Sequence, residues 1–175
     1  MGVRAEAAKE CVRFELIDKI EFVSDTRLVG VKYVSLAEEY LADHFPSFPV
    51  LPGVLMLESA AQGAGWLLHL QHDFSGSMAI LKEARNVKYG NFVAAGDFLR
   101  IEVELVKLTD SGGMFKASGS VNNATALQGR LELAYFNLAD RDSKLAEIDA
   151  GLREHNRRRW ELLKPRQGQQ IINNK

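Results

Sequence analysis

A histidine and a glutamate lie on either side of a proline-rich loop, and together they could transfer protons. His44 opens the loop, and Glu58 follows Pro52, the last of its prolines, by six residues. A neutral imidazole is a competent general base at neutral pH. Glu58 falls on an apolar helix, where partial withdrawal from water favours the protonated carboxylic acid. The pair therefore predicts general acid–base chemistry.

The start of the predicted helix adds a third group. The backbone N–H groups of Gly53 and Val54 would be unpaired donors in the first turn, where the helix dipole also favours negative charge. Donors of this kind can stabilise an oxyanion. Gln62 lies one helical turn beyond Glu58 and can hydrogen-bond to it, although packing at a subunit contact is an open alternative. We treat Gly53 and Val54 as oxyanion candidates and Gln62 as a supporting residue.

The stretch from Asp43 to Gln62 resembles the signature of the 3-hydroxyacyl-[acyl carrier protein] dehydratases of the FabZ and FabA type. In this family, a His-Phe-Pro loop and a Pro-Gly-Val helix start precede an acidic residue and a glutamine. The matching positions in this sequence are His44, Phe45, Pro46, Pro49, Pro52, Gly53, Val54, Glu58 and Gln62. The resemblance covers most of residues 12–138 at the level of element order, and the C-terminal segment lies outside it.

The resemblance implies the α+β hot-dog fold, in which an antiparallel sheet wraps around a long central helix. The hot-dog domain would span residues 1–140, and residues 141–175 would form a basic helical extension. The implied activity is that of a hydro-lyase without a cofactor, which converts (3R)-3-hydroxyacyl thioesters of acyl carrier protein or CoA to trans-2-enoyl thioesters. The implied assembly is a homodimer, or a trimer of such dimers, in which His44 of one chain works with Glu58 of the other.

Dehydration requires three operations, and the candidate residues can supply all of them. His44 would remove a proton from C2, while the N–H groups of Gly53 and Val54 would stabilise charge on the thioester oxygen. Glu58 would protonate the hydroxyl that leaves C3. The same groups would hydrate an enoyl thioester in the reverse direction, so the favoured direction stays open.

An acyl chain would enter between the two subunits. Candidates for lining its tunnel are large apolar residues near the two catalytic candidates: Phe45, Phe48, Leu51, Met56 and Trp66. The alternative for a set with this spacing is simple hydrophobic core.

Two family glycines are replaced, by Asp43 before the histidine and by Ser47 after the Phe-Pro pair. The His-Arg-Tyr-Pro-Phe segment common near the N-terminus of housekeeping members is also absent. Both a fatty-acid role and a specialised lipid or polyketide pathway therefore stay open. Rival functions are a hot-dog acyl thioesterase, which would not need His44, and a non-catalytic acyl-binding or scaffolding subunit.

Two other groups of residues could bind ligands. His69 and His72 lie near the end of the long helix without a third metal ligand nearby, so we interpret them as cations that complement the helix dipole. The run Arg157–Arg159 could dock the acidic helix of a carrier protein, or it could be a solvated helix face.

The elements that must position these residues follow from hydrophobic periodicity and turn signals. Strands are predicted at 12–23, 27–34, 78–89, 98–108, 115–121 and 126–138, and helices at 35–42 and 53–72. The second helix is apolar nearly all round, so it needs burial on several sides, which a strongly curved sheet would supply. Gly63 and Gly65 within it predict a close backbone approach.

A last helix is predicted after Asp142 or Ser143, either of which could cap it. On this helix Leu145, Ile148 and Leu152 share one face. Asp149 and Arg153 are spaced for an (i, i+4) ion pair.

Composition indicates one globular domain, since 46% of the 175 residues are hydrophobic and 26% are charged. Cys11 is the single cysteine, which excludes an intrachain disulfide. Neither a secretory signal nor a membrane span is visible, and a cytoplasmic location is expected. Residues 141–175 hold nine Lys or Arg against five Asp or Glu, an excess too small to predict nucleic-acid binding.

Overall fold

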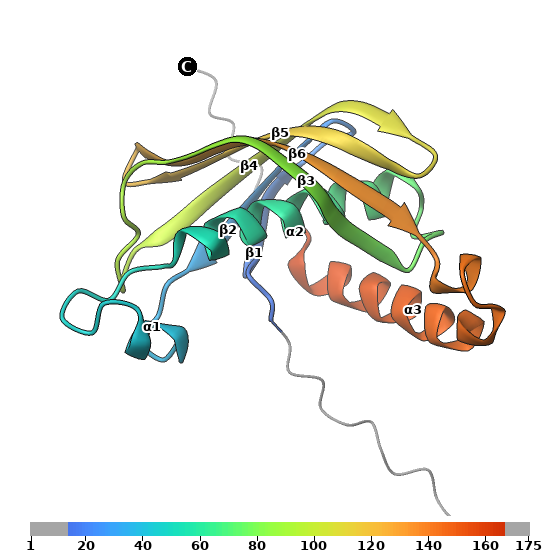
Figure 1. Ribbon diagram of the computed structural model, residues 1–175, viewed down its shortest axis with the longest axis horizontal. Helices are drawn as coiled ribbons and strands as arrows, with labels where there is room; N and C mark the ends of the chain where they lie inside the picture. Colours follow the sequence, from blue (N-terminus) through green and yellow to red (C-terminus); the bar gives the residue numbers. More distant parts are fainter. Residues whose placement is uncertain (1–13, 167–175) are drawn as a thin grey trace, which may run out of the picture.

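The computed structural model describes residues 14–166, so Cys11 lies outside the described residues. Six strands form one antiparallel sheet in the order β1-β2-β4-β5-β6-β3. The strands are β1 (Lys19–Val23), β2 (Arg27–Tyr33), β3 (Met78–Tyr89), β4 (Phe98–Thr109), β5 (Gly112–Val121) and β6 (Ala124–Phe136). Helix α2 (Gly53–Gln71) lies in the concave face of this sheet (Figure 1).

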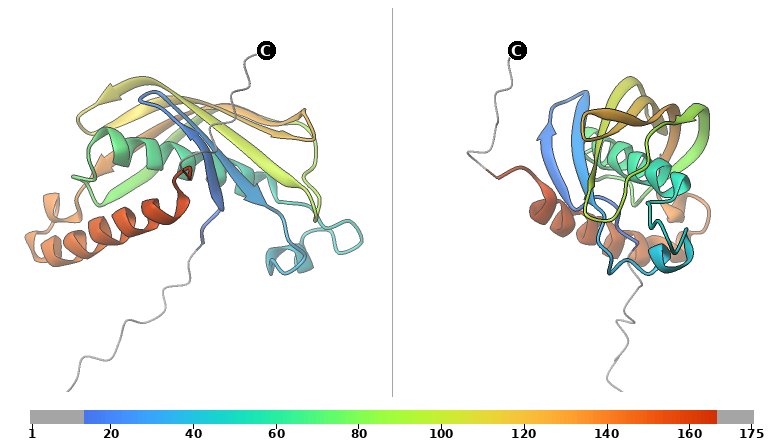
Figure 2. Two further views of the ribbon diagram at one scale, coloured as in Figure 1. Left: turned by 180° about the vertical axis from the view of Figure 1, so that it is seen from behind. Right: turned by 90° about the vertical axis from the view of Figure 1, so that its left-hand side faces the viewer.

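The sheet curls around α2, as the end view in Figure 2 shows, and the helix contacts every strand from β2 to β6. This confirms the predicted α+β fold with a sheet wrapped around a long central helix. No helix within residues 14–166 has the length and the continuous apolar run that crossing a membrane requires.

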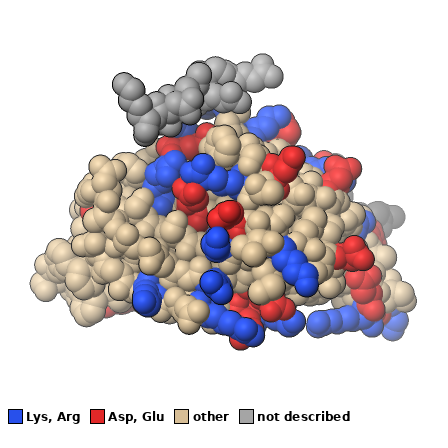
Figure 3. Space-filling model, turned by 90° about the horizontal axis from the view of Figure 1, so that it is seen from above, with Lys and Arg blue, Asp and Glu red and all other residues tan. Residues whose placement is uncertain are grey.

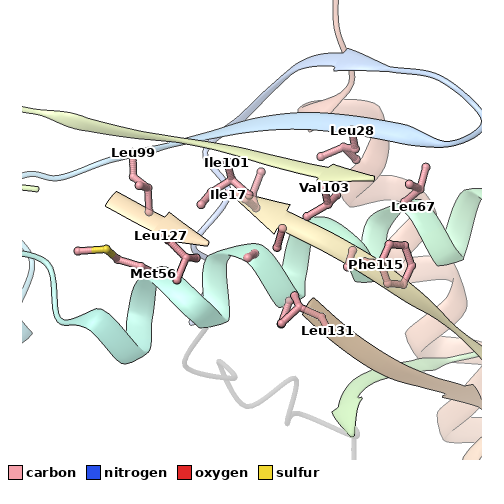
Figure 4. Close-up of a cluster of buried hydrophobic side chains, with 14 of the residues drawn as sticks. Ile17, Leu28, Met56, Leu67, Leu99, Ile101, Val103, Phe115, Leu127 and Leu131 are labelled. Atoms are coloured by element: carbon pink, nitrogen blue, oxygen red, sulfur yellow. The ribbon is translucent and has the colours of Figure 1, made fainter. Parts of the chain in front are cut away.

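The core fills the space between α2 and the sheet (Figure 4). Leu67 of α2 and Ile101, Phe115 and Leu127 of the strands are at most 1% exposed. Full burial of an aliphatic or aromatic side chain of this size contributes roughly 1.5–3 kcal/mol. A Cβ added at Gly65 would lie 3.3 Å from the Cβ of Ala79 in β3, which confirms the predicted close approach there.

The predicted element boundaries hold for α2, β2, β3 and β4 to within one or two residues. β1 begins only at Lys19, because the backbone of Phe14 and Leu16 bonds to the side chain of Gln62 instead of a strand. Helix α1 is reduced to Tyr40–Asp43. β6 begins and ends two residues earlier than predicted, since Asn122 and Asn123, at φ 50° and 65°, complete a tight two-residue hairpin loop.

Helix α3 (Ala146–Leu163) packs against the C-terminal half of α2, on the side away from the sheet (Figure 1). Two short 3₁₀ turns, η1 (Leu138–Asp140) and η2 (Ser143–Leu145), connect it to β6. The rings of Trp66 and Trp160 lie 6.1 Å apart at this contact. The predicted apolar face of α3 is wrong, since Ile148 is 52% exposed and the helix packs through Trp160 and Leu163.

Asp149 anchors the first turns of α3. Its carboxylate, 1% exposed, accepts hydrogen bonds from the Ser77 hydroxyl and from the N–H groups of Leu138 (2.9 Å) and Ala139 (2.8 Å). Burial opposes its ionisation, but these hydrogen bonds, helped by the positive charge of Arg153, outweigh burial and hold its pKa below the ordinary value. The predicted direct ion pair with Arg153 does not form among the described residues, and Arg153 Nη1 donates instead to Asn137 Oδ1 at 2.7 Å.

His69 joins α2 to α3 as a neutral side chain. Its Nε2 accepts from the amide of Asn156 (3.3 Å), so its Nδ1 carries the proton and donates to the Tyr135 hydroxyl (3.2 Å). Burial, together with the nearby charge of His72, lowers the pKa of His69 to about 4. The predicted cationic role for His69 is therefore wrong, and neither of its nitrogens is left free for a metal.

We expect acid to weaken the folded state through His69. Because its pKa in the folded protein lies below the ordinary 6.5, its contribution is complete above pH 6.5 and is lost as the pH falls towards 4. The loss should amount to about 3 kcal/mol in the free energy of unfolding. Urea unfolding followed by tryptophan fluorescence measures it, since both tryptophans lie at the α2–α3 contact.

The matched variants are His69→Leu, which removes the titrating group, and His155→Gln on α3. His69→Leu should lose the pH dependence between 6.5 and 4, whereas His155→Gln should keep it. An unchanged pH dependence in His69→Leu would assign the effect to other groups.

Candidate active site

Hydrogen bonds to the surrounding loop fix the orientation of His44. The backbone N–H of His44 donates to the Tyr40 carbonyl (3.2 Å) in α1, and the ring atom Nδ1 lies 2.9 Å from the Val50 carbonyl oxygen. A carbonyl can only accept, so Nδ1 carries the proton and the lone pair of the neutral ring is on Nε2. The ring is half-buried, with Nε2 as the basic atom.

The loop that carries His44 is anchored at its far end. Val50 is 1% exposed and forms a β-bridge with Ala94, and the N–H of Leu51 donates to Val93 at 2.8 Å. The backbone of Phe45 adopts φ 55°, a left-handed conformation that is uncommon outside glycine. Asp43 and Ser47 adopt no positive φ, so the two replaced family glycines impose no such strain at their own positions.

The first turn of α2 presents two backbone donors. Leu55 and Met56 donate their N–H groups to the Pro52 carbonyl at 2.9 and 3.2 Å. Within residues 14–166 the N–H groups of Gly53 and Val54 have no hydrogen-bond acceptor. They therefore match the geometry expected of a helix start that can bind an anionic oxygen.

The Tyr89 ring packs closely against Gly53, the first residue of α2. A Cβ added at Gly53 would lie 3.2 Å from this ring, which comes from the end of β3. A side chain at this position would press on the ring, which would have to shift by a few tenths of an ångström. The contact brings the end of β3 against the candidate oxyanion donors.

Gln62 holds Glu58 and the N-terminal segment together. Its Oε1 accepts the N–H of Leu16 at 2.8 Å, and its Nε2 donates to the carbonyl of Phe14 and to Glu58 Oε1, both at 2.9 Å. The amide cannot be flipped without losing these bonds. Because Oε1 of Glu58 accepts a hydrogen bond, a proton on this carboxyl belongs on Oε2.

Within residues 14–166 no hydrogen bond joins His44 to Glu58, and both side chains are half-buried. Phe45, Phe48 and Val54, which lie near them in the sequence, are exposed apolar side chains. Exposed Tyr89 and Phe92 come from the end of β3 and the loop after it, where Tyr89 lies against Gly53 and the Phe92 ring lies 5.8 Å from that of Phe48. In Figure 3 charged side chains of both signs are interspersed over the middle of the sheet's outer face, whereas the end that carries α1 is mostly uncharged.

The five tunnel candidates fall into different environments. Leu51 and Met56 are 1% and 3% exposed and pack in the hydrophobic core, the alternative considered for this set. Phe45 and Phe48 are more than half exposed on the loop. Trp66 is half-buried between α2 and α3.

The run Arg157–Arg159 is engaged by the chain itself. Arg157 donates to the Asp73 carbonyl at 3.1 Å and lies over the Phe74 ring. Arg158 pairs with Glu154 at 3.5 Å, and Arg159 pairs with Glu15. Arg157 and Arg158 nevertheless stay exposed, which agrees with the alternative of a solvated helix face, and docking of a carrier protein on this run stays a prediction.

Sequence reasoning missed the contacts that position the candidates. The Val50 carbonyl and the Phe14 and Leu16 backbone leave no signal in the sequence, because every residue has a carbonyl and nearly every residue an N–H. The contact between Tyr89 and Gly53 joins residues 36 positions apart, and the place of Tyr89 at the end of β3 is not visible from either residue alone.

The family model described as FabA-like domain matches residues 10–130. The chain belongs to this family. A FabZ 3-hydroxyacyl-[acyl-carrier-protein] dehydratase of Clostridium perfringens is 36% identical over 121 residues, which cover 69% of this chain and 87% of the relative. The corresponding enzyme of Pelotomaculum thermopropionicum is 42% identical over 123 residues, with the same coverage. The predicted membership of the dehydratase family is confirmed.

Solved structures support the fold. The dehydratase heterocomplex ApeI:P from Xenorhabdus doucetiae gives a TM-score of 0.63 at 21% identity, covering 75% of this chain and 89% of that one. A thioesterase from Pseudomonas aeruginosa gives 0.53 at 14% identity, covering 67% and 79%. Because dehydratases and thioesterases share the fold, the sequence relatives decide the family. The match to the family model ends at residue 130, so α3 of this FabA-like protein lies beyond the matched domain.

We predict that Gln62→Met lowers the free energy of unfolding by about 1–3 kcal/mol, because it leaves the N–H of Leu16, a buried residue, without its acceptor. Gln71→Met is the matched control, since Gln71 makes one exposed hydrogen bond to the Asp25 carbonyl. The control should cost less than about 1 kcal/mol. Chemical unfolding measures both, and equal losses would mean that Gln62 does not clamp the segment.

Proposed function

We propose that this protein dehydrates 3-hydroxyacyl thioesters of an acyl carrier protein to trans-2-enoyl thioesters, at a site built from His44 of one subunit and Glu58 of the other. The observation that carries the proposal is the hydrogen bond from His44 Nδ1 to the Val50 carbonyl, in a chain of the FabA-like family. This bond orients the ring and leaves Nε2 as the base.

In the proposed reaction, His44 Nε2 takes a proton from C2 of the substrate. The N–H groups of Gly53 and Val54 bind the thioester oxygen, where negative charge develops. The electron pair of the C2–H bond forms the C2=C3 double bond, and the C3–O bond breaks. Glu58 gives its proton from Oε2 to the departing hydroxyl, which leaves as water.

At the end of the reaction His44 is protonated and Glu58 is ionised. Before the next turnover His44 must lose its proton and Glu58 must regain one. Gln62 supports this role because it donates to Oε1 in either protonation state of Glu58 and keeps Oε2 for the substrate.

The edge strand β3 supports a two-subunit site. It has twelve residues and lies at one end of the sheet order, so one side of its backbone has no neighbouring strand in the described chain. Long, unprotected edge strands tend to pair with another copy. The exposed Val54 and Tyr89 would be covered in such a dimer, and we propose a twofold homodimer as the working assembly.

The direct test is turnover of a 3-hydroxyacyl thioester, followed through enoyl absorbance and free thiol in one assay. We expect enoyl product without thiol. His44→Ala and Glu58→Gln should each lower kcat about 10²–10⁴-fold, as removal of a general base or acid does. Release of thiol, or full activity in His44→Ala, would contradict the dehydratase proposal.

Mixing the two inactive variants tests whether the site is shared. After subunit exchange, a heterodimer has one site with both native residues, so activity should return to about a quarter of wild type for a twofold dimer. The control is a mixture of His44→Ala with a second preparation of itself. If the subunits exchange but activity does not return, both residues of a site lie on one chain.

A further inference from the structure

A cavity of about 210 Å³ lies beyond Glu58, between α2, α3 and the segment before β1. Its lining includes Gln62 and Trp66 of α2, Ala79 of β3, and Asn156, Arg159 and Leu163 of α3. Three of these residues belong to α3, which the family model does not include. The cavity is therefore shaped by a part of the chain that is outside the family domain.

The cavity continues the helix face that carries Glu58. Glu58, Gln62 and Trp66 are four residues apart in turn, which places them along one side of α2. Gln62 both bonds to Glu58 and lines the cavity. The rise from Glu58 to Trp66 is about 12 Å, a distance that a medium-length acyl chain can span.

The wall supplied by α3 is polar. Arg159 pairs with Glu15, so the two charges compensate each other. The Nε of Arg159 is nevertheless buried and has no hydrogen-bond partner among the described residues. A buried unsatisfied donor is rare and calls for an acceptor. Since the pair is neutral overall, the acceptor that fits is a neutral oxygen rather than a carboxylate.

We propose that this cavity receives the far end of the acyl chain, and that it selects chains of limited length that carry a neutral oxygen acceptor, such as a hydroxyl, carbonyl or ester, near that end. The inference rests on the proposed dehydratase function. It deepens that function by assigning the substrate class to the wall that α3 provides.

The first experiment fills the cavity. Ala79→Leu places a larger side chain in its lining, and Ala150→Leu on the exposed side of α3 is the matched control. We expect Ala79→Leu to lower kcat/KM about tenfold or more for the longest accepted 3-hydroxyacyl thioester and to leave 3-hydroxybutyryl turnover unchanged. Unchanged chain-length profiles in a folded Ala79→Leu variant would overturn the assignment.

The second experiment tests the polar wall. Plain 3-hydroxyoctanoyl thioester is compared with its terminal hydroxyl and methyl ester analogues in wild type, Arg159→Leu and the control Arg158→Leu. Wild type should prefer the oxygenated chains about tenfold, as expected for a buried hydrogen bond to a charged donor. Arg159→Leu should lose the preference and Arg158→Leu keep it. No preference in wild type would remove the polar selectivity.

Binding without turnover separates this inference from the proposed function. Octanoyl pantetheine and its terminal hydroxyl analogue have no 3-hydroxyl group, so they cannot be dehydrated. Their binding should change the tryptophan fluorescence, because Trp66 lines the cavity and Trp160 lies beside it, and Ala79→Leu should abolish the change. If binding behaves in this way but no dehydration is detected, the dehydratase proposal fails alone. If dehydration occurs while Ala79→Leu leaves binding intact, the cavity assignment fails alone.

Discussion

The need to bury α2 governs the structure of this protein. The helix is apolar on nearly every side, so water must be excluded all around it. The curved sheet covers one side, and α3 with the segment 14–17 covers the other side of the C-terminal half. The first turn keeps exposed apolar surface, with Val54 68% exposed. This N-terminal end of α2 also carries the candidate oxyanion donors Gly53 and Val54.

Polar groups on a buried helix must all have partners, and this requirement positions the candidate site. Glu58 is held by Gln62, and Gln62 is in turn saturated by the backbone of Phe14 and Leu16. His69, one of the few other polar residues of α2, is neutral and bonds to Tyr135 and Asn156. The same side chains therefore satisfy the core and fix the orientation of a candidate catalytic acid.

The C-terminal helix changes what this fold can enclose. Asp149 anchors one end of α3 through three hydrogen bonds, and Trp160 and Leu163 pack its other end. Arg159 ties it to Glu15, next to the residues that Gln62 holds. The extension thus closes the side of α2 opposite the sheet and forms one wall of the cavity beyond Glu58.

The sequence by itself determined the fold, the family and the candidate residues. Strand alternation and the Pro-Gly helix start are local patterns, and the order of His44, Glu58 and Gln62 is linear information. The tertiary structure alone decided the tautomer of His44, the orientation of Gln62 and the neutral state of His69, because each depends on a partner that periodicity does not reveal. Periodicity also failed on α3, which packs through Trp160 and Leu163 instead of the expected apolar face. Its Asp149 accepts backbone hydrogen bonds instead of forming the expected direct ion pair. Burial and hydrogen-bond partners are properties of distant segments brought together, and a linear pattern does not contain them.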